Sequence, residues 1–360
     1  MIMSKKNYLL KPDEPLLRKC LKHIQSLPNL EVKLNQTQDL LDSSSVDGLL
    51  TIRSSIKSAD YAYTIQPDVT ANTVKLVIRY FKLLKEKFKN KLILITRYLS
   101  DTTIEQLLNE NIEFIDSLGN IYIDSSAAYI FVRGKHRLNV KPLSHKQITP
   151  ISFKIIYSLL KNPEILTLPL QELADNTGTT LSSITNTLEN LYKLGYIMRQ
   201  PRGGYRIANY IKLFERWEIG YVETLRPKLL IETFTYTKEN KFSEFAENII
   251  NLASANNILI GGELGAALTT SYLLPQSATL HVTGNHHLIA AKLQLKPDAK
   301  GAITFLTQFG KQNYGASIQG ACVADPLLIH AELMTESDDR LEETAELIFT
   351  KYIKDKYQNA

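Results

Sequence analysis

Hydrophobic residues in the first 142 positions of the chain form short runs that alternate with helical periodicities. Short apolar runs bounded by polar residues predict strands, and they lie at Gly48–Ile52, Ala62–Ile65, Leu92–Thr96, Ile112–Ile115 and Tyr129–Val132. Apolar positions three and four residues apart predict helices, and they lie at Pro15–Ser26, Thr70–Phe88 and Asp101–Asn109. Strands that alternate with helices favour a partly parallel sheet. We therefore expect an α/β domain over residues 1–142.

The pattern becomes helical from Ile148 onward, after a basic linker around Pro142. Thr149 or Ser152 can cap a first helix, and Asn162-Pro163 ends it because proline cannot continue the hydrogen-bond ladder. A second helix is expected at Leu170–Asn176 and a third from Thr180 or Leu181 to Leu194, with Gly178 providing the turn between them. The apolar residues expected to face the core of this module are Ile151, Ile155, Leu159, Leu181, Ile184, Leu188 and Leu191.

Helices and strand-like runs alternate again from Asn209 to Ala360 and predict a second α/β region. The expected helices are Ile211–Leu225, Phe242–Ala255, Ala266–Tyr272 and Leu341–Lys354, and the expected strands are Ile258–Gly261, Thr279–Val282 and Ala302–Leu306. The sequence thus predicts an α/β multidomain protein with domains at 1–142, 146–208 and 209–360.

Composition narrows the class of protein only slightly. The chain has 42 Lys and Arg against 37 Asp and Glu, a net charge of +5 that fits an anionic partner without establishing one. No apolar stretch approaches the roughly 20 residues of a membrane span, and no signal-peptide pattern follows Met1. Cys20 and Cys322 lie far apart and lack metal-ligand spacing. We expect a cytoplasmic protein without disulfides, a membrane segment or a zinc ribbon.

The predicted third helix of the central module carries small polar side chains on the face that points away from the core. They are Thr179, Thr180, Ser182, Ser183, Thr185 and Asn186. Such side chains let a helix lie deep in the major groove of DNA and form hydrogen bonds with base edges or phosphates.

The segment Tyr196–Ile207 reads as a strand, a glycine turn and a second strand, which is the pattern of a wing. Arg199, Arg202 and Arg206 lie in or near its tip, where guanidinium groups can bind phosphates or enter a minor groove. From Lys146 to Arg206 there are seven basic residues and four acidic ones. The order of elements predicts a winged helix-turn-helix that binds double-stranded DNA. A three-helix module that binds another protein is the alternative.

Several segments resemble the AbiEi family of transcriptional regulators, which are antitoxins of type IV toxin–antitoxin systems. They are Ile95–Tyr98, Phe114–Ile123, Phe214–Trp217, Leu225–Leu229 and Gly261–Ala267. The resemblance implies an autorepressor of a two-gene operon that binds its own promoter. It also implies a nucleotidyltransferase-like toxin as a partner, directly or indirectly.

The N-terminal region is also similar to a restriction-endonuclease core, which binds magnesium through an Asp on one strand and Glu-x-Lys on the next. Asp47 can fill the first position, but Thr64 and Gln66 occupy the places where Glu and Lys would be needed. A single aspartate does not provide the several oxygen ligands of a hydrolytic metal site. We therefore expect this domain to be inactive.

The C-terminal region also contains a possible active site. Gly261-Gly262 resembles the turn of nucleotidyltransferases that approaches the triphosphate. In such enzymes a following strand carries two carboxylates that bind magnesium. Here that strand reads Ala278–Val282 and has no acid, and Glu263 cannot supply the pair. His286-His287 is expected in a loop, without the further ligands of a metal site. We expect a degenerate nucleotidyltransferase-like domain.

These observations favour a DNA-binding regulator that is not an enzyme and uses no cofactor or metal. The alternative from another class is a nuclease or nucleotidyltransferase with an attached DNA-binding module. The missing carboxylates at both expected sites disfavour it.

Overall fold

The computed structural model describes residues 14–35, 46–67, 69–71, 73–88, 90–134, 148–200, 203–236, 242–309, 317–318, 321–335 and 338–354. The chain divides into two compact units. The first comprises residues 1–145 with 193–195, and the second comprises 146–192 with 196–360. Most of the expected central module and the whole C-terminal region therefore share one unit. The three-domain division remains a prediction.

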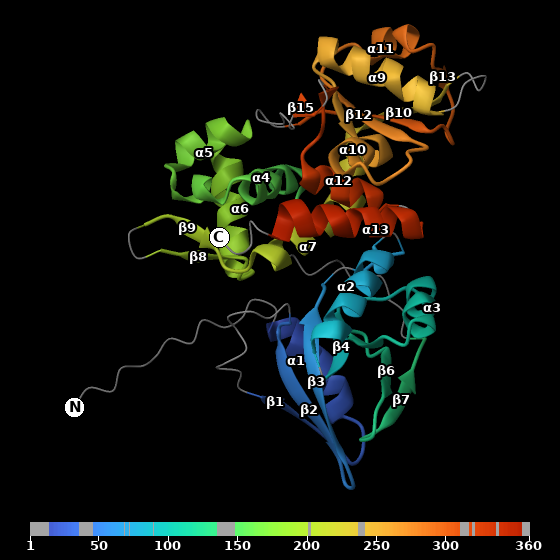
Figure 1. Ribbon diagram of the computed structural model, residues 1–360. Helices are drawn as coiled ribbons and strands as arrows, with labels where there is room; N and C mark the ends of the chain where they lie inside the picture. The colour runs from blue at the N-terminus through green and yellow to red at the C-terminus, as the bar shows by residue number, and fades with distance from the viewer. Residues whose placement is uncertain are drawn as a thin grey trace. The chain divides into compact units, whose positions relative to one another are not determined.

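The first unit contains a seven-stranded mixed sheet in the order β1-β2-β3-β4-β5-β6-β7 (Figure 1). Its strands are β1 (Leu30–Asn35), β2 (Gly48–Ser54), β3 (Ser58–Ile65), β4 (Lys91–Thr96), β5 (Glu113–Asp116), β6 (Ile121–Asp124) and β7 (Tyr129–Val132). The three central strands β3, β4 and β5 are parallel and the outer pairs are antiparallel. The expected partly parallel sheet is confirmed.

Three helices accompany this sheet: α1 (Glu14–Gln25), α2 (Val74–Lys87) and α3 (Asp101–Asn109). The apolar face of α1, which includes Leu17, Cys20 and Ile24, is buried against inward-facing residues of the sheet. Ser100 caps α3 by accepting a hydrogen bond from the backbone N–H of Thr103. Strand β1 was not predicted although apolar and polar residues alternate along it, because the expected strands were taken from continuous apolar runs and this exposed edge strand has none.

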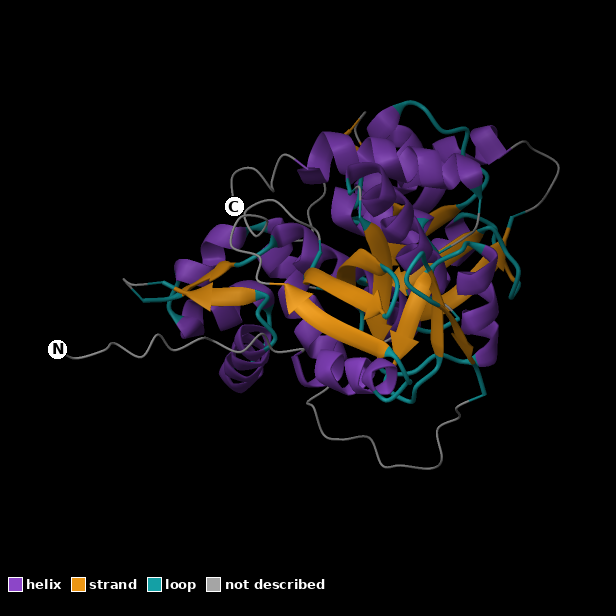
Figure 2. Cartoon of the chain, turned by 90° about the horizontal axis from the view of Figure 1, so that it is seen from below, coloured by secondary structure: helices purple, strands orange, loops and turns teal. Residues whose placement is uncertain are grey.

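The second unit begins with three helices and a hairpin, which we call the helix–hairpin module (residues 148–208). Its elements are α4 (Pro150–Lys161), a 3-10 turn η1 (Pro163–Thr167), α5 (Leu170–Thr177), α6 (Leu181–Lys193), β8 (Ile197–Arg199) and β9 (Tyr205–Ile207). Their order agrees with the order expected from the sequence. In Figure 2 the hairpin forms two short antiparallel arrows beside the helices of the module.

Two residues expected in the core of the module are exposed instead. The side chains of Ile151 and Leu181 are 48% and 44% exposed, while Ile184, Leu188 and Leu191 are buried as predicted. Ile151 and Leu181 lie in the first turns of α4 and α6, at the ends of the helices. Spacing alone does not distinguish a buried helix position from one that projects beyond its neighbours.

The C-terminal region of the second unit contains a five-stranded sheet in the order β11-β12-β14-β10-β13. Its strands are β10 (Leu230–Thr235), β11 (Leu259–Gly261), β12 (Ala278–Val282), β13 (Lys296–Pro297) and β14 (Ile303–Thr307). A separate two-stranded sheet pairs β15 (Ser317–Ile318) with β16 (Ala321–Cys322). Within the five-stranded sheet, β12 and β14 are parallel and the other pairs are antiparallel.

Helices cover both faces of this sheet (Figure 1). They are α9 (Phe242–Asn256) and α11 (His286–Lys292) on one face, and α10 (Gly262–Thr270) and α12 (Pro326–Leu333) on the other. The remaining helical segments are α7 (Tyr210–Gly220), the π-helical turn η2 (Tyr221–Leu225), α8 (Arg226–Leu229), α13 (Asp339–Ile348) and the π-helical turn η3 (Phe349–Ile353). The expected second α/β region is therefore observed.

The starts of helices α10 and α11 differ from the elements expected from the sequence. Helix α10 begins at Gly262, directly after the strand, rather than at Ala266. His286 and His287 begin helix α11, capped by Asn285, so their expected placement in a loop was wrong. Among the residues that the structure describes, no helix has both the length and the apolar character of a membrane span.

Candidate nucleic-acid interface

The turn between α5 and α6 fixes the start of the third helix of the module. Gly178 ends α5 with φ 64°, the left-handed conformation that glycine adopts without strain. Thr180 then caps α6, because its hydroxyl accepts a hydrogen bond from the backbone N–H of Ser183 (3.3 Å). The predicted turn glycine and one of the alternative helix starts are confirmed.

The six polar residues predicted to face DNA lie together at this turn and in the first two turns of α6. Thr180, Ser182 and Asn186 are exposed, and Thr179, Ser183 and Thr185 are half-buried. Several hydroxyl groups bond within the module. Thr179 lies 2.8 Å from the hydroxyl of Thr177, and Thr185 donates to the carbonyl of Leu181 (3.0 Å).

These local bonds change the chemistry of the face. The hydroxyl of Thr180 accepts a hydrogen bond from the backbone of α6, and the hydroxyl of Thr185 donates one to it. Leu181 is exposed between these two residues. Ser182 and Asn186 remain as exposed polar side chains of the predicted set. The face therefore combines polar groups with aliphatic surface, whereas the sequence predicted only polar groups.

The hairpin places its arginines on two different faces. Arg199 is paired with Tyr205, and Met198 is paired with Arg206. Paired residues of an antiparallel ribbon lie on one face, and successive residues alternate between faces. Arg199 and Arg206 therefore point to opposite sides of the hairpin, which the sequence analysis did not anticipate. Arg202 lies outside the described residues.

The guanidinium group of Arg199 lies over an aromatic ring of α6. Its central carbon is 5.0 Å from the centre of the Tyr192 ring, and this ring is 6.1 Å from that of Tyr205. Cation–π contacts of this kind hold a guanidinium in place without neutralising it. The hairpin turn itself uses Gly203 and Gly204, both with positive φ. Arg199 is thus a positioned positive charge at the junction of helix and hairpin.

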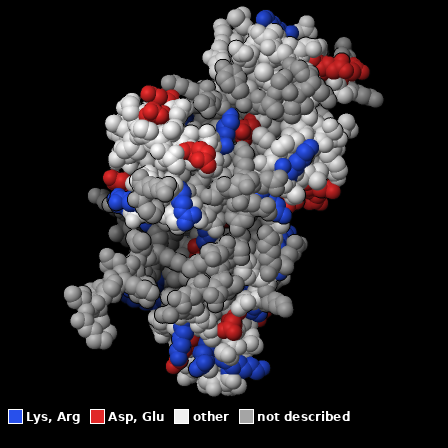
Figure 3. All heavy atoms as spheres, turned by 60° about the vertical axis from the view of Figure 1, so that its left-hand side comes forward, with Lys and Arg blue, Asp and Glu red and all other residues white. Residues whose placement is uncertain are grey.

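Charge alone does not mark an interface on the face of the molecule drawn in Figure 3. The face shown in Figure 3 carries both acidic and basic side chains over the described surface. Glu189 is exposed on α6, between the polar first turns and Lys193. Specific side chains, rather than net charge, therefore distinguish the candidate interface.

The module is joined to the C-terminal region by aromatic packing between α4 and α7. The indole N–H of Trp217 donates to the carbonyl of Phe153 (3.1 Å), and its ring stacks on Tyr157 at 5.6 Å. The Tyr210 hydroxyl donates to the carbonyl of Leu160 (2.8 Å). Gly220 lies against the Phe153 ring, where a Cβ atom would clash. These contacts fix the orientation of α4, and through it the module, on α7.

The Gly-Gly turn of the C-terminal region faces a buried carboxylate. The backbone N–H of Gly262 donates to Glu332 Oε2 at 2.7 Å, and the hydroxyl of Tyr221 donates to Glu332 Oε1 at 2.9 Å. His281 Nε2 lies 2.9 Å from the same Oε1 atom. Glu332, Tyr221 and His281 are all buried. A carboxylate of the chain thus occupies the turn that resembled a triphosphate-binding one.

Strand β12 explains which residues meet this carboxylate. Ala278, Leu280 and Val282 belong to the core cluster shared with α9 and α11. Thr279 and His281 therefore point to the other face, because side chains alternate along a strand. On this face β12 thus carries a hydroxyl and an imidazole and no carboxylate. The sequence prediction of an acid-free strand is correct, but it missed Glu332.

The ionisation of this cluster follows from its partners. Burial raises the pKa of Glu332, but His281, Arg226 and the Gly262 N–H together hold it below its ordinary value. Burial, with the charge of Glu332 as a smaller cause, raises the pKa of the Tyr221 hydroxyl well above its usual range. The structure thus favours an ionised Glu332 beside a neutral Tyr221.

Glu332 had one signal in the sequence. It lies with His330 in the otherwise apolar helix α12, and ionisable residues within an apolar run are rarely buried unless they are paired. His330 is indeed paired with Glu218 of α7, and both side chains are buried. Pairing therefore explains both ionisable residues of α12.

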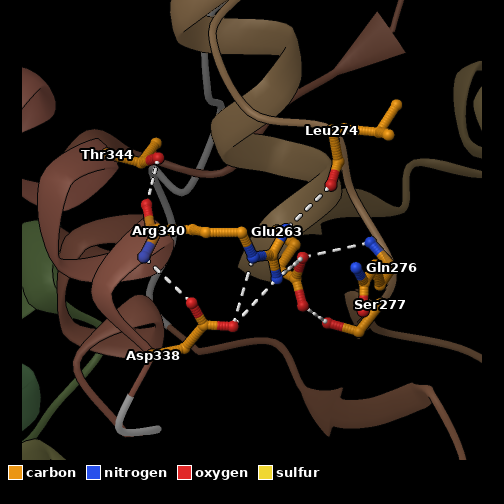
Figure 4. A network of polar contacts seen from close by, with 7 residues as sticks. All are labelled: Glu263, Leu274, Gln276, Ser277, Asp338, Arg340 and Thr344. Carbon is orange, nitrogen blue, oxygen red and sulfur yellow. Dashed lines mark hydrogen bonds and ion pairs between the residues drawn. The ribbon is translucent and has the colours of Figure 1, made fainter.

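Glu263, which follows the Gly-Gly turn, also has partners within the domain (Figure 4). Its carboxylate accepts hydrogen bonds from the backbone of Gln276 and the hydroxyl of Ser277, both at 3.0 Å. It also lies 3.5 Å from Arg340, which bonds to Asp338 and to the carbonyl of Leu274. Glu263 therefore ties α10 to the segment before β12 and to α13.

The candidate acid of the N-terminal unit is engaged in a similar way. Asp47 Oδ2 accepts a hydrogen bond from the backbone N–H of Ile65 (2.8 Å), and the Thr64 hydroxyl lies 3.5 Å from it. Gln66 follows directly after β3. Within the part of the chain that the structure describes, no group of three or more His, Cys, Asp or Glu side chains is arranged to hold a metal ion.

One region of the chain matches a model of a known protein family. No curated protein and no solved structure matches the chain. The matched segment begins within β9 and ends after η3, so it contains Trp217, the Gly-Gly turn and Glu332 but not α4, α5 or α6. Residues 206–354 match the family model described as transcriptional regulator, AbiEi antitoxin, type IV TA system.

Proposed function

We propose that this chain is a DNA-binding transcriptional regulator, in which residues 146–208 form a winged helix-turn-helix that binds the promoter of its own operon. The observation that carries the proposal is the exposed first half of α6, which follows the Gly178 turn, in a module whose hairpin bears Arg199 and Arg206 and contacts the far end of the same helix at Tyr192. A helix presented in this way fits a major groove, and flanking guanidinium groups fit phosphates.

The match of residues 206–354 to a family of transcriptional regulators also supports this role. It names an antitoxin of a type IV system. We infer that the protein acts in the cytoplasm as the autorepressing antitoxin of a two-gene operon, with a nucleotidyltransferase-like toxin as its partner, directly or indirectly.

The C-terminal region is proposed to be a degenerate nucleotidyltransferase-like scaffold without catalytic activity. Glu332 supports this view, because a buried carboxylate bonded to the Gly262 N–H repels a second anion at that turn. The N-terminal unit is proposed to be an inactive restriction-endonuclease-like domain, because Asp47 is bonded to β3. Magnesium-dependent nucleotidyl transfer by the purified chain would overturn the first statement. Magnesium-dependent cleavage of DNA would overturn the second.

A promoter reporter tests the regulatory proposal. The DNA upstream of the chain's gene is placed before a reporter gene, and the chain is supplied from a second plasmid. Wild-type protein should repress the reporter, and an Arg199→Ala, Arg206→Ala double variant of equal abundance should repress it less. Full repression by the double variant, or no repression by the wild type, would contradict the proposal.

The proposed partner needs its own test. Expression of the neighbouring gene of the operon should arrest growth, and co-expression of the chain should restore it. Growth arrest that the chain does not relieve would remove the antitoxin role and leave the repressor role standing.

A further inference from the structure

The exposed face of α6 has an apolar side that polar readout of DNA does not explain. Leu181 is 44% exposed although its neighbours Ile184 and Leu188 are buried. Thr185 follows four residues later and so lies on the same side of the helix. Tyr192, eleven residues after Leu181, continues this side toward the hairpin. Leu181, Thr185 and Tyr192 form what we call the apolar edge of α6.

The hydroxyl of Thr185 does not contribute a polar group to this edge. It donates to the backbone carbonyl of Leu181 at 3.0 Å, which turns the oxygen toward the helix axis. The methyl group is then the part of the Thr185 side chain that is not turned to the backbone. The first two turns of the apolar edge consequently present an isobutyl group and a methyl group.

The surroundings of the apolar edge indicate which partner would cover it. Arg199 lies over Tyr192 at its far end, so the edge runs from aliphatic side chains to a positioned positive charge. Glu189 is exposed between these ends, and a carboxylate repels phosphate. This arrangement favours phosphate contacts at the hairpin and base contacts at the first turns of α6.

The major groove of DNA offers one prominent apolar group, the C5-methyl of thymine. We propose that Leu181 and the methyl group of Thr185 read thymine methyl groups in the operator. The inference rests on the proposed DNA-binding function and adds to it the class of sequence recognised, namely sites with thymine at defined positions. Replacing these thymines by deoxyuracil removes the methyl group and keeps base pairing.

The experiment uses the full-length protein and duplexes that it selects from a random-sequence pool. Each thymine of a selected duplex is replaced in turn by deoxyuracil, and the Kd is measured for both duplexes. Wild-type protein should bind the thymine form about fourfold more tightly at each contacted position, as expected for one buried methyl group. The ratio of the two Kd values does not depend on the folded fraction of a variant.

Three variants assign the contact to these side chains. Leu181→Ala should bind the thymine and deoxyuracil forms equally at one position. Thr185→Ser should lose the preference at a second position, whereas Thr185→Val should keep it, because only valine retains a methyl group there. Leu170→Ala is the matched control, since Leu170 is a leucine of similar exposure (41%) at the first position of α5. It should keep both preferences.

The outcomes separate this inference from the proposed function. Selective DNA binding without any preference for thymine over deoxyuracil would overturn the inference and leave the proposed function intact. A preference that Leu181→Ala and Thr185→Ser both retain would also overturn it. Failure to select any duplex would remove the proposed function and the inference together.

Discussion

Glu332 accepts a 2.7 Å hydrogen bond from the backbone N–H of Gly262, at the turn where β11 passes into α10. An anion is thus bound at the turn, but it belongs to the chain itself and comes from α12. The same carboxylate contacts Tyr221 of η2 and His281 of β12. Glu332 therefore connects the Gly-Gly turn with the segment that leads from the module.

Loss of this carboxylate should destabilise the protein. Glu332→Leu removes the acceptor of two hydrogen bonds, the buried contact of His281 and the negative charge near Arg226. Breaking a buried pair in this way costs about 3–5 kcal/mol of unfolding free energy. Glu332→Gln should cost less, because an amide oxygen can still accept from Gly262.

Urea unfolding followed by circular dichroism measures both changes. Glu247→Gln is the control, since Glu247 is an exposed carboxylate on α9. An unfolding free energy of Glu332→Leu within about 0.5 kcal/mol of the wild type, the range of neutral surface changes, would refute the structural role of the carboxylate.

The stability supplied by Glu332 should depend on pH. Its pKa in the folded protein lies below the ordinary value of 4.5, because His281, Arg226 and the Gly262 N–H outweigh the opposing effect of burial. A depressed carboxyl pKa stabilises the folded state above the unfolded-state pKa, and the stabilisation is lost as the pH falls through the folded-state value. The difference in unfolding free energy between wild type and Glu332→Gln should therefore shrink below pH about 4.5.

Measurement of both proteins by urea unfolding from neutral to acidic pH tests this expectation. Parallel pH profiles for the two proteins would show that Glu332 does not titrate with a depressed pKa.

Two glycines of the same region should respond differently to a methyl group. Gly262 has φ +60°, and an added Cβ would lie 2.8 Å from Thr279 Oγ1 and 3.0 Å from the Thr279 backbone nitrogen. The left-handed conformation alone costs an alanine about 1–2 kcal/mol. Gly284 is not left-handed, and an added Cβ there meets nothing within 4 Å. Gly262→Ala should lower the Tm by several degrees, and Gly284→Ala should leave it unchanged.

Differential scanning calorimetry provides the comparison. Equal Tm values for Gly262→Ala and Gly284→Ala would contradict the close approach of the turn to β12.

The two cysteines should differ in reactivity. Cys20 is completely buried between α1 and the sheet of the first unit, and burial, with the nearby charge of Asp116, raises the pKa of its thiol to about 12. Cys322 is half-buried. Because the thiolate is the reactive form, a thiol reagent at neutral pH should modify Cys322 first and Cys20 only after unfolding.

Mass spectrometry of peptides from the folded protein identifies the modified residue. Rapid modification of Cys20 under native conditions would be inconsistent with its place in the core.

Local patterns predicted much of the fold. Apolar runs located β2, β3, β4 and β5, and Thr149, one of the two alternative caps named for α4, is the cap observed. Segments without a clear apolar run were missed, among them the edge strand β1. Helix α12 was missed as well, because its apolar residues surround the helix on all sides and give no periodicity.

The candidate interface was predicted in outline but not in its chemistry. Sequence placed Thr180 and Thr185 on one face, but their hydroxyls bond to the backbone, which depends on rotamers rather than on residue type. The opposite directions of Arg199 and Arg206 follow from the register of the hairpin, which the glycine turn leaves open in sequence. The ionisable residues of the apolar helix α12 indicated that they are paired, but nothing local in the sequence identifies Gly262 as a partner of Glu332.

Substitution of the hairpin arginines tests whether the hairpin contacts DNA phosphates. Arg199→Ala, Arg202→Ala and Arg206→Ala should each weaken binding and reduce the salt dependence, because each phosphate contact releases about one counterion. Lys300→Ala is a control with the same change in charge, at an exposed residue just before β14.

Fluorescence anisotropy can measure whether the helix–hairpin module binds the chain's own promoter. Labelled DNA from upstream of the gene is titrated with full-length protein at increasing salt, and an unrelated duplex of equal length serves as the reference. We expect tighter binding of the upstream DNA, a steep decrease of affinity with salt, and a salt slope that falls by about one unit in each arginine variant but not in Lys300→Ala. Equal affinity for both duplexes, or affinities unchanged in all three arginine variants, would contradict this expectation.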